Sequence, residues 1–468
     1  MKTDNAGSAP TSLPHSARQS RLRCVNRRSV RGKTGTTDED AGGVPNSDLT
    51  SAMRKEYTEF LGFKSIFFFC SLPLRLDSYR GCSHGCLYCL SRVLNNRSYA
   101  FDDAIIAASP DRLARFMVRA LREQSNIGPV SSCIRHRVPA HFGCVSDPLQ
   151  PAERQHRTTQ GFLKVLQQHD YPYVLCTKST MAADHPYIDI FADTHCSIQV
   201  SFSTFDACLA GRLEPKAPPP AQRLRTLERL AAAGIYTVAR LQPLLYPAEQ
   251  LSSGVFETLA GAGVRHVVVE HLRIPTNARA SSREALRAAI GLDMLAEYRR
   301  LGLRHSRVSH ELPSKLKLAN VLFARREANR LGMTFGSGDN EFHHLSDHIC
   351  CCGIPATPAF ANIYEGHFGR AAMQGLRSGR VSFGYLDRVW HPEGSIREYV
   401  NSDCRIDGPN TVYAFLTDRL GRPGRSNSPL GYFGIVATRS KGYRFVASIR
   451  NTLLEGHNHV LGQRLPSG

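Results

Sequence analysis

The sequence predicts an α/β protein built on a partial or full TIM-type (β/α) barrel, followed by a basic C-terminal α+β extension. Two observations lead to this prediction. Short apolar segments with strand character alternate with amphipathic helical segments from about Tyr57 to Arg273, and six such units in succession require a parallel sheet with right-handed crossovers. The chain has 468 residues and is 42% hydrophobic, which is enough to bury the cores of two or three domains.

Six segments of this region carry the apolar, β-branched or aromatic residues that are typical of buried strands. The first lies in the most apolar stretch of the chain, which is too short to cross a membrane. The expected strands are KSIFFFCS (64–71), RVPAHFGCVS (137–146), YPYVLCTKS (171–179), SIQVSFST (197–204), YTVARLQPLL (236–245) and VRHVVVEHL (264–272).

Helices are expected between these strands from the spacing of the apolar residues. Ser109-Pro110 marks a helix start, and Gly234 is placed as the left-handed residue that closes a strong helix. The expected helices are DDAIIAASPDRLARFMVRALREQ (102–124), TTQGFLKVLQQH (158–169), HPYIDIFADT (185–194) and PAQRLRTLERLAAAG (220–234), with two more at 283–303 and 315–331.

The two ends of the chain differ from the barrel region in composition. Residues 1–52 contain few large apolar side chains and are expected to form a disordered basic tail. Within it, Arg18 to Lys33 holds seven basic residues and no acidic one, as in an arm that binds nucleic acid or in a solvated extension without function. We expect a barrel at 53–310, a helical segment with a His/Cys-rich loop at 311–378, and a basic β-rich domain with antiparallel strands at 379–468.

The number of cysteines and the net charge limit the classes of function that the chain can have. The N-terminus lacks the apolar segment of a signal peptide, so a reducing, cytoplasmic location is expected. In that compartment the 14 cysteines favour metal binding or catalysis over disulfides. The formal net charge of +19 would attract polyanions, nucleic acid first among them, although a solvated basic surface has the same composition.

The motif that carries the chemistry is YRGCSHGCLYCLSR (79–92), in which Cys82, Cys86 and Cys89 follow a C-x3-C-x2-C spacing. A structural zinc site needs four ligands and usually takes them from two C-x2-C pairs, and the sequence has no second pair. Cys350 and Cys352 would form only a C-x-C pair, which is a poor zinc knuckle. A [4Fe–4S] cluster can instead bind one cysteine at each of three irons and keep its fourth iron open. The spacing therefore favours the cluster.

GCSHGCLYC after the first expected strand of a β/α barrel resembles the signature of radical S-adenosylmethionine (SAM) enzymes. The resemblance implies that SAM binds the open iron and that an electron from the cluster cleaves the sulfonium. The resulting 5′-deoxyadenosyl radical would abstract hydrogen from a substrate. Tyr88 would lie near the adenine, with plain packing as the alternative. A reductant such as flavodoxin or ferredoxin is an implied partner.

Four further segments are similar to the spore photoproduct lyase-like branch of these enzymes: residues 141–160, 174–180, 197–204 and 212–235. The resemblance covers roughly Phe67 to Pro247. It implies that a lysine at the end of the T-K strand pairs with the SAM carboxylate and that a Ser-Asp pair receives the SAM amino group. Two serines on one face of the fourth strand would contact the ribose or carboxylate, or simply bond the backbone. These SAM-binding candidates are Lys178, Ser146, Asp147, Ser201 and Ser203.

Cys144 is the candidate catalytic residue. It lies in CVSD (144–147), a C-x-S-D setting in which the resemblance implies a cysteine that returns a hydrogen atom to the product radical. A buried core cysteine is the alternative, because cysteine is among the most frequently buried residues. Glu214 and Arg223 match two further positions of the branch and are expected to form an ion pair that braces the barrel rim.

A second group of ligand-type residues lies in SGDNEFHHLSDHICCCGIP (337–355). A second metal ion or cluster near Cys350–Cys352 is one expectation, and a lid near the substrate is another. Three adjacent cysteines reach one ion poorly, because alternate side chains point apart, so a buried turn with unpaired thiols is the third. His343 and His348 are alternatively acid–base groups that face the substrate.

The chain also departs from the lyase pattern. Its long C-terminal region is unrelated, and the lyase's lesion-handling residues are not found, so a DNA photolesion is a doubtful substrate. The basic aromatic run 431–450 is suited to stacking bases, or to an ordinary amphipathic sheet. The sequence thus predicts a radical SAM enzyme, lyase-like, with an unidentified substrate for which nucleic acid is the leading class. The alternative is a metal-stabilised nucleic-acid-binding protein without catalysis.

Overall fold

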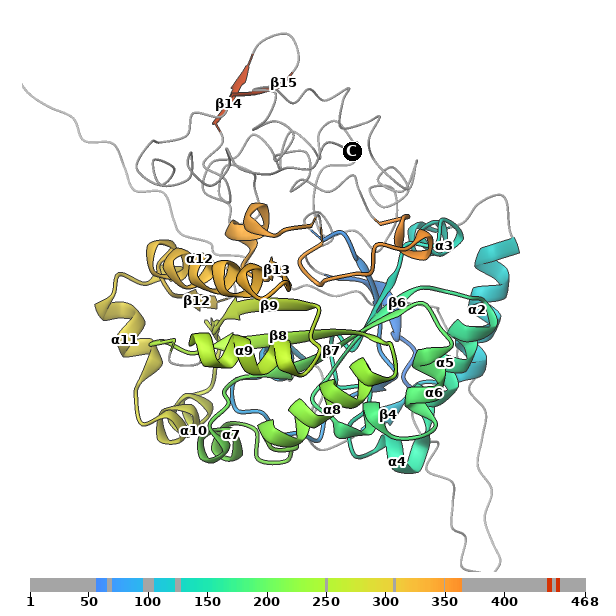
Figure 1. Ribbon diagram of the computed structural model, residues 1–468, viewed down its shortest axis with the longest axis horizontal. Helices are drawn as coiled ribbons and strands as arrows, with labels where there is room; N and C mark the ends of the chain where they lie inside the picture. The colour runs from blue at the N-terminus through green and yellow to red at the C-terminus, as the bar shows by residue number, and fades with distance from the viewer. Residues whose placement is uncertain are drawn as a thin grey trace, which may run out of the picture. The chain divides into compact units, whose positions relative to one another are not determined.

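The computed structural model describes residues 56–64, 70–95, 105–122, 128–248, 251–305, 309–348, 350–363, 436–439 and 443–446 (Figure 1). The chain divides into two units, Met1–Ser51 and Ala52–Gly468, and every described residue belongs to the second. The expected tail 1–52 and most of the expected domain 379–468 therefore lie outside the described residues. Among the described residues, no helix is both long and apolar enough to cross a membrane.

The centre of the fold is an eight-stranded sheet with the strand order β1-β2-β5-β6-β7-β8-β9-β13. Every neighbouring pair from β2 to β13 is parallel, and only the edge strand β1 is antiparallel. The predicted parallel β/α architecture is confirmed. β1 and β13 are the two edges of this sheet, so within the described residues the barrel is partial. The strands are β1 (Leu61–Phe63), β2 (Leu74–Leu76), β5 (Ala140–Phe142), β6 (Tyr173–Thr177), β7 (Cys196–Phe202), β8 (Tyr236–Leu244), β9 (His266–His271) and β13 (Thr334–Ser337).

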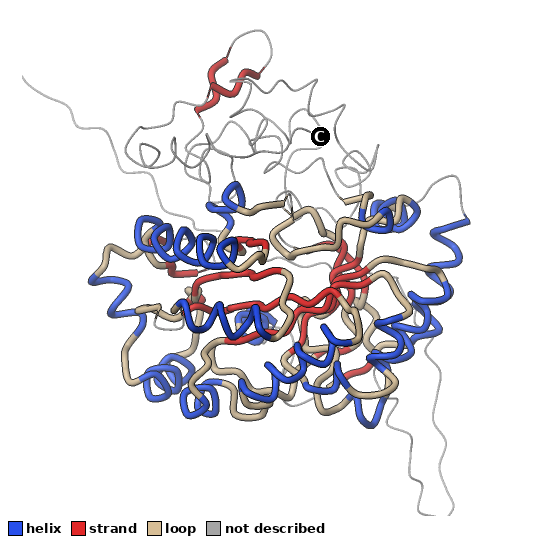
Figure 2. The backbone as a smooth tube through the Cα atoms, in the orientation of Figure 1, coloured by secondary structure: helices blue, strands red, loops and turns tan. Residues whose placement is uncertain are grey.

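Helices lie along the outside of the curved sheet (Figure 2). The longer ones connect successive parallel strands, as right-handed crossovers require. They are α2 (Pro110–Arg122), α3 (Pro129–Arg135), α5 (Thr158–Gln168), α6 (Tyr187–Ala192), α7 (Ala207–Leu213), α8 (Pro220–Ala232), α9 (Ser253–Gly261), α10 (Ala280–Ile290), α11 (Met294–Arg300) and α12 (Ser314–Arg330). Short elements complete the described part: α1 (Leu90–Asn95), α4 (Glu153–His156), β3 (Tyr79–Arg80), β4 (Ile106–Ala107), β10 (Ile274–Pro275), β11 (Arg304–His305) and β12 (Ser309–Glu311).

The helix boundaries follow local sequence signals. α2 begins at Pro110, and the hydroxyl of Ser109 accepts a hydrogen bond from the backbone N–H of Arg112 at 3.3 Å. α8 begins with Pro220 in its first turn, where the missing N–H of proline has no cost. It is closed by Gly234 at φ 77°, which confirms the left-handed residue expected there.

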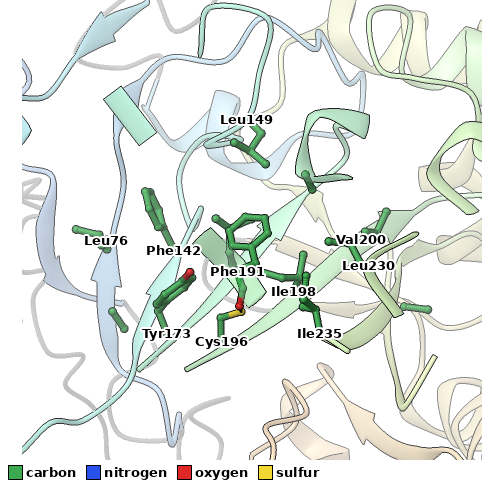
Figure 3. Close-up of a cluster of buried hydrophobic side chains, with 14 of the residues drawn as sticks. Leu76, Phe142, Leu149, Tyr173, Phe191, Cys196, Ile198, Val200, Leu230 and Ile235 are labelled. Atoms are coloured by element: carbon green, nitrogen blue, oxygen red, sulfur yellow. The ribbon is translucent and has the colours of Figure 1, made fainter. Parts of the chain in front are cut away.

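A layer of apolar side chains lies between the sheet and the helices (Figure 3). Phe142, Tyr173 and Ile198 come from three adjacent strands, and Phe191 and Leu230 come from helices that cover them. All five are at most 1% exposed. Since successive residues of a strand point to opposite faces, the alternate residues of the same strands point into the barrel, and these are mostly polar.

The structure differs from the expected elements at both ends of the sheet. The first parallel strand is β2, not the apolar segment 64–71, of which 65–69 lie outside the described residues. In β2, Leu74 and Leu76 are buried while Arg75 between them bonds Asp77 and Tyr57, so the strand is short and alternating. At the other end, β13 pairs with β9 although it lies in the segment 311–378 that was expected to be helical. The sheet therefore continues past residue 310.

Two short strands of the C-terminal region are described. β14 (Val436–Arg439) and β15 (Tyr443–Val446) form an antiparallel hairpin. The hairpin agrees with the antiparallel strands expected there, and the other expected strands of 379–468 lie outside the described residues.

Candidate functional site

The cysteine loop follows β3 and folds back on itself through glycine. Gly81 and Gly85 have φ values of 88° and 68°, in the left-handed region that favours glycine. The side chain of Gln150 clamps the loop from the segment after β5, because it accepts from the backbone N–H of Ser83 at 2.9 Å and donates to the carbonyl of Gly81 at 3.0 Å. The backbone N–H of Leu87 donates to the carbonyl at the end of α7 at 2.9 Å. The loop is thus held by segments far away in sequence.

Cys82, Cys86 and Cys89 are all free and partly exposed. Burial raises the pKa of Cys82 to about 12, and the charge of Asp147 acts in the same direction. Burial also raises the pKa of Cys86 and Cys89, while the nearby positive charge of Lys178 opposes the increase at both. The charges of Cys82 and Cys89 further raise the pKa of Cys86, so the three thiols lie within electrostatic range of one another. A bound cation would remove their protons.

The donor set fits a cluster better than a single ion. Within the described residues, no group of three or more His, Cys, Asp or Glu side chains is arranged to hold one metal ion. A [4Fe–4S] cluster does not require such convergence, since each cysteine binds a different iron at a corner of the cube. Three thiols on one compact loop, with an ammonium close to two of them, are consistent with that larger group.

The carboxylate of Asp147 connects the cysteine loop to the end of β6. One oxygen accepts from the backbone N–H of Lys178 at 2.7 Å and lies 3.1 Å from Nε2 of His84, a loop residue. The other accepts from the hydroxyl of Thr177 at 2.7 Å and from the N–H of Leu149 at 2.9 Å. Burial by itself raises the pKa of Asp147, but the charge of His84 and these hydrogen bonds lower it below its usual value. Asp147 is therefore ionised, and both of its carboxylate oxygens accept hydrogen bonds that connect the cysteine loop to the end of β6.

Glu214 forms a second link on the other side of the loop. Its carboxylate pairs with the guanidinium of Arg223, which confirms the ion pair expected from the sequence, and both side chains are 1% exposed. It also accepts from the hydroxyl of Tyr88 and lies 3.7 Å from the ammonium of Lys178. Burial by itself raises the pKa of Glu214. The charges of Lys178 and Arg223 together lower the pKa by more than this, so its pKa lies below the usual value. The ammonium of Lys178 also lies 5.8 Å from the centre of the Tyr88 ring.

A cavity of about 290 Å³ opens beside the cysteine loop. It is lined by Tyr88 and Cys89 from the loop, by Cys144 and Lys178 beyond the ends of β5 and β6, and by Ser201 near the end of β7. These strands are parallel, so their carboxyl ends meet on one face, where β/α barrels place their active sites. The structure thus brings one cysteine of the loop, the candidate catalytic thiol and three of the candidate SAM-binding residues to one cavity.

The remaining candidates do not line this cavity. The hydroxyl of Ser146 is 2.7 Å from the carbonyl of Tyr79, to which it donates. Ser203 follows the end of β7 and is 1% exposed. Neither Ser146, Asp147 nor Ser203 is among the residues that line the cavity.

Sequence analysis missed the polar residues that β8, β9 and the segment after β9 contribute to the cavity: Gln242, Glu270, His271 and Arg273. Glu270 pairs with Arg240 at 3.2 Å and with Arg273. The signal that could have found them is position, since polar residues at or just beyond the carboxyl ends of β8 and β9 are placed on the active face of a barrel.

The His/Cys-rich segment closes the barrel from inside. The carbonyls of Cys351, Cys352 and Gly353 are held by side chains of β9 and β7: His266 at 3.0 Å, Gln199 at 2.6 Å and Ser197 at 2.9 Å. Cys350 and Cys352 are each 3% exposed. We call residues 350–353 the barrel plug. The turn therefore buries two of its three thiols, while Cys351 is partly exposed.

Within the described residues, this segment does not bring three ligand-type side chains together around one metal ion. The expectation of a second metal ion or cluster near Cys350–Cys352 stays a prediction. Asp339, which belongs to this segment, is buried and bonds Nδ1 of His271 at 2.6 Å and the ammonium of Lys317 at 3.3 Å. Lys317 also pairs with Glu311 at 3.0 Å and Glu341 at 3.1 Å. Burial lowers the pKa of His343. Asp339 therefore balances buried positive charge behind the cavity, and no single-ion site occurs among the described residues.

A polar network fills the interior between the cavity and the barrel plug. Lys64 can only donate, so Nδ1 of His141, which it contacts, must accept. The ring proton then lies on Nε2, 2.9 Å from the sulfur of Cys176, and the Cys176 thiol lies 2.9 Å from Oε1 of Gln199. The hydrogen bonds therefore run in one direction, from Lys64 to the carbonyl of Cys352.

Comparison with known proteins gives distant matches. No family model matches the chain. Proteins of Mycobacterium tuberculosis and Mycobacterium bovis, both named as uncharacterized proteins, are 27% identical over 221 residues. That match covers 45% of this chain and 62% of each relative, so the chain spans less than two thirds of their length.

Among solved structures, the chain matches spore photoproduct lyase with a TM-score of 0.45 and 14% identity, over 59% of this chain and 79% of the lyase. The lyase complexed with a dinucleoside spore photoproduct gives a TM-score of 0.44 at 16% identity, over 59% and 78% of the two chains. SuiB of Streptococcus suis bound to S-adenosylmethionine gives 0.32 at 11% identity, over 47% of each chain.

Proposed function

We propose that this chain is a radical SAM enzyme of the spore photoproduct lyase-like kind. Cys82, Cys86 and Cys89 would hold a [4Fe–4S] cluster, and the adjoining cavity would hold SAM. The observation that carries the proposal is the position of the C-x3-C-x2-C loop, which lies beside a cavity at the carboxyl ends of parallel strands with Lys178, Cys144 and Ser201 in its wall. When bound, such a cluster supplies the electron that cleaves SAM to a 5′-deoxyadenosyl radical, which abstracts hydrogen from substrate.

The role of the protein would be to orient SAM. The ammonium of Lys178 lines the cavity and would pair with the SAM carboxylate as a charge-assisted contact. Glu214 and the backbone bond to Asp147 fix this lysine from two sides. Tyr88 offers a ring beside the cavity for the adenine, and Ser201 offers a hydroxyl. Ser146, Asp147 and Ser203 would complete the site from just behind the wall.

Cys144 would be the catalytic thiol. It lines the cavity, and its sulfur is 3.2 Å from the carbonyl of His141. Burial raises the pKa of Cys144 to about 12, even with the opposing charge of Lys64, so the group is a neutral thiol at neutral pH. A neutral thiol can transfer a hydrogen atom: its S–H bond breaks, a C–H bond forms on the substrate radical, and a thiyl radical is left on Cys144.

We propose nucleic acid as the leading substrate class, on the basis of the net charge of +19. The lyase structure named above contains a dinucleoside photoproduct, and a SuiB structure contains a precursor peptide. A peptide is therefore the class against which nucleic acid should be tested. Electrons would come from a reductant such as flavodoxin or ferredoxin.

The deciding experiment is anaerobic reconstitution with iron and sulfide, followed by SAM and dithionite. The expected result is brown protein with about four irons and four sulfides per chain and formation of 5′-deoxyadenosine. Cys82→Ala should abolish 5′-deoxyadenosine, whereas Cys208→Ala, which removes an exposed thiol outside the cavity, should not. Colourless protein that binds zinc stoichiometrically would contradict the proposal and support a metal-stabilised binding protein.

A further inference from the structure

A stripe of arginines runs along the exposed face of α2. Arg112, Arg115, Arg119 and Arg122 follow one another at intervals of three, four and three residues, which is the spacing of one helix face. All four are exposed. The opposite face of α2 buries Leu113, Met117 and Ala120, so the helix is held rigidly by the core.

The stripe borders a cleft of about 530 Å³ between α2, β1 and the start of α3. Arg112, Arg115 and Arg119 line this cleft together with apolar side chains that include Phe116 and Val130. One carboxylate, that of Glu56, is among the lining residues, and it lies 3.3 Å from Arg112. The described lining of the cleft is therefore positively charged, and the ion pair between Arg112 and Glu56 is exposed and weak.

A second cleft of the same chain is also lined by arginines, but its positive charge is more nearly balanced by acidic residues. Arg283, Arg287 and Arg299 line a cleft of about 230 Å³, but two carboxylates, Glu284 and Asp293, line it with them. Arg287 and Glu284 make two hydrogen bonds at 2.6 and 2.8 Å. Counted over the part of the chain that the structure describes, three arginines and two acids line that cleft, whereas three arginines and one acid line the cleft beside α2. The two clefts thus have the same number of lining arginines, and they differ in how much of that positive charge is left unbalanced by acidic side chains.

We propose that the α2 cleft binds the phosphate backbone of a nucleic acid. Arg112 and Arg122 are ten residues apart, roughly 15 Å along the helix axis. A nucleic acid strand in a duplex carries one charge per about 3.4 Å of axis, so the stripe spans several successive phosphates. Guanidinium groups match phosphate oxygens with paired N–H donors. Phe116 supplies an aromatic face in the cleft for an unpaired base.

A membrane surface is less well matched by the same features. Basic amphipathic helices bind membranes by inserting their apolar face, and the apolar face of α2 is already buried in the core. The cleft is also concave, whereas a bilayer is flat on this scale. A linear polyanion can enter the cleft and follow the stripe.

The site goes beyond the proposed enzymatic function, because none of its residues lines the cavity beside the cysteine loop. Binding is therefore to be measured on full-length protein and on its Cys82→Ala variant, by fluorescence anisotropy with labelled single-stranded DNA, single-stranded RNA and duplex DNA. Equal affinities of the two proteins separate nucleic-acid binding from the cluster chemistry.

The test compares two triple variants with equal loss of charge. Arg115, Arg119 and Arg122 changed to Gln should weaken binding at least tenfold at about 0.1 M salt, and should reduce the slope of log K against log [salt] by about 2 to 3. Arg283, Arg287 and Arg299 changed to Gln should weaken it less than about twofold. Circular dichroism checks that both triple variants fold. If the α2 triple variant does not fold, the single variant Arg119→Gln replaces it and is expected to weaken binding about threefold.

Three outcomes would overturn the proposal. The first is that the two triple variants weaken binding equally, and the second is that the parent protein does not bind nucleic acid. The third is that the α2 arginines are needed for binding to vesicles with 30% phosphatidylserine but not for binding to nucleic acid. A stripe-dependent loss for single strands but not for duplex would support the proposal and identify the strand form.

Discussion

One carboxylate oxygen of Asp147 accepts a hydrogen bond from the backbone N–H of Lys178 at 2.7 Å, and the same oxygen lies 3.1 Å from Nε2 of His84. A single side chain thus fixes the lysine that lines the cavity relative to the cysteine loop. The sequence indicates a polar group at this position, and the structure shows that its oxygens are already used within the protein.

Asp147→Asn should destabilise the fold in a pH-dependent way. The pKa of Asp147 is lowered overall, against the effect of burial, so its ionised form stabilises the folded state. This contribution is present above the unfolded pKa, near 4, and is lost as the pH falls through the lower folded pKa. Urea unfolding should show a loss of about 2–4 kcal/mol at pH 7 that shrinks between pH 4 and pH 2. Asp170→Asn, at a side chain that is 72% exposed, is the matched control. A loss that does not vary with pH would contradict the assignment.

Glu214→Gln should destabilise the protein by about 3–5 kcal/mol, because it leaves the buried guanidinium of Arg223 without its charge partner. Chemical denaturation measures the loss. Glu284→Gln removes an ion pair with Arg287 on an exposed helix face and should leave the unfolding midpoint nearly unchanged. The double variant Glu214→Gln with Arg223→Met should be less destabilised than the sum of the two single changes. Simple additivity would show that the two groups are not coupled.

Cys144→Ala should separate SAM cleavage from product formation. Formation of 5′-deoxyadenosine should stay within about twofold of the parent rate, since the thiol acts after cleavage, while the products formed from substrate should change. Because burial raises the pKa of Cys144 to about 12, the product ratio of the parent enzyme should not vary between pH 6.5 and 9. Chromatography of the products at several pH values measures both. A product ratio that titrates near pH 8 would indicate a thiolate in place of a neutral thiol.

Gly336→Ala should disrupt the barrel plug. A methyl group at this position would lie 2.1 Å from the carbonyl oxygen of Cys351, which is backbone and cannot turn away. Overpacking of this kind costs about 1–3 kcal/mol or more. Gly211→Ala, where nothing lies within 4 Å of the added methyl group, should be neutral or slightly stabilising because it replaces glycine within α7. Thermal unfolding of the two variants tests the difference, and equal melting temperatures would contradict it.

The sequence predicts the middle of the fold well because the strands from β6 to β9 are long, are rich in β-branched and aliphatic residues and lie between clear helices. It fails at β2 and β13, which are short. β2 contains Arg75 between two leucines, and β13 reads Thr-Phe-Gly-Ser, so neither stands out from a loop.

The candidate site follows the same logic. The three cysteines lie close together in sequence, at positions 82, 86 and 89, so their spacing alone marks them as a candidate ligand set. The contacts of Asp147 with His84, and of Glu214 with Lys178 and Tyr88, join residues that are 36 to 126 positions apart. No local pattern encodes them, because they depend on how the parallel strands bring their ends together.

The position of the barrel plug has a consequence for biosynthesis. Side chains of Ser197, Gln199 and His266 bond the carbonyls of residues 351–353 in the folded protein. During translation these carbonyls emerge from the ribosome more than 80 residues after His266, so the three side chains lack their partners until then. Translation therefore yields a nascent chain whose interior stays open to water well after strands β2 to β9 have emerged. An expression fragment that ends at 310 lacks the barrel plug and should be prone to aggregation, whereas one that ends at 363 includes it.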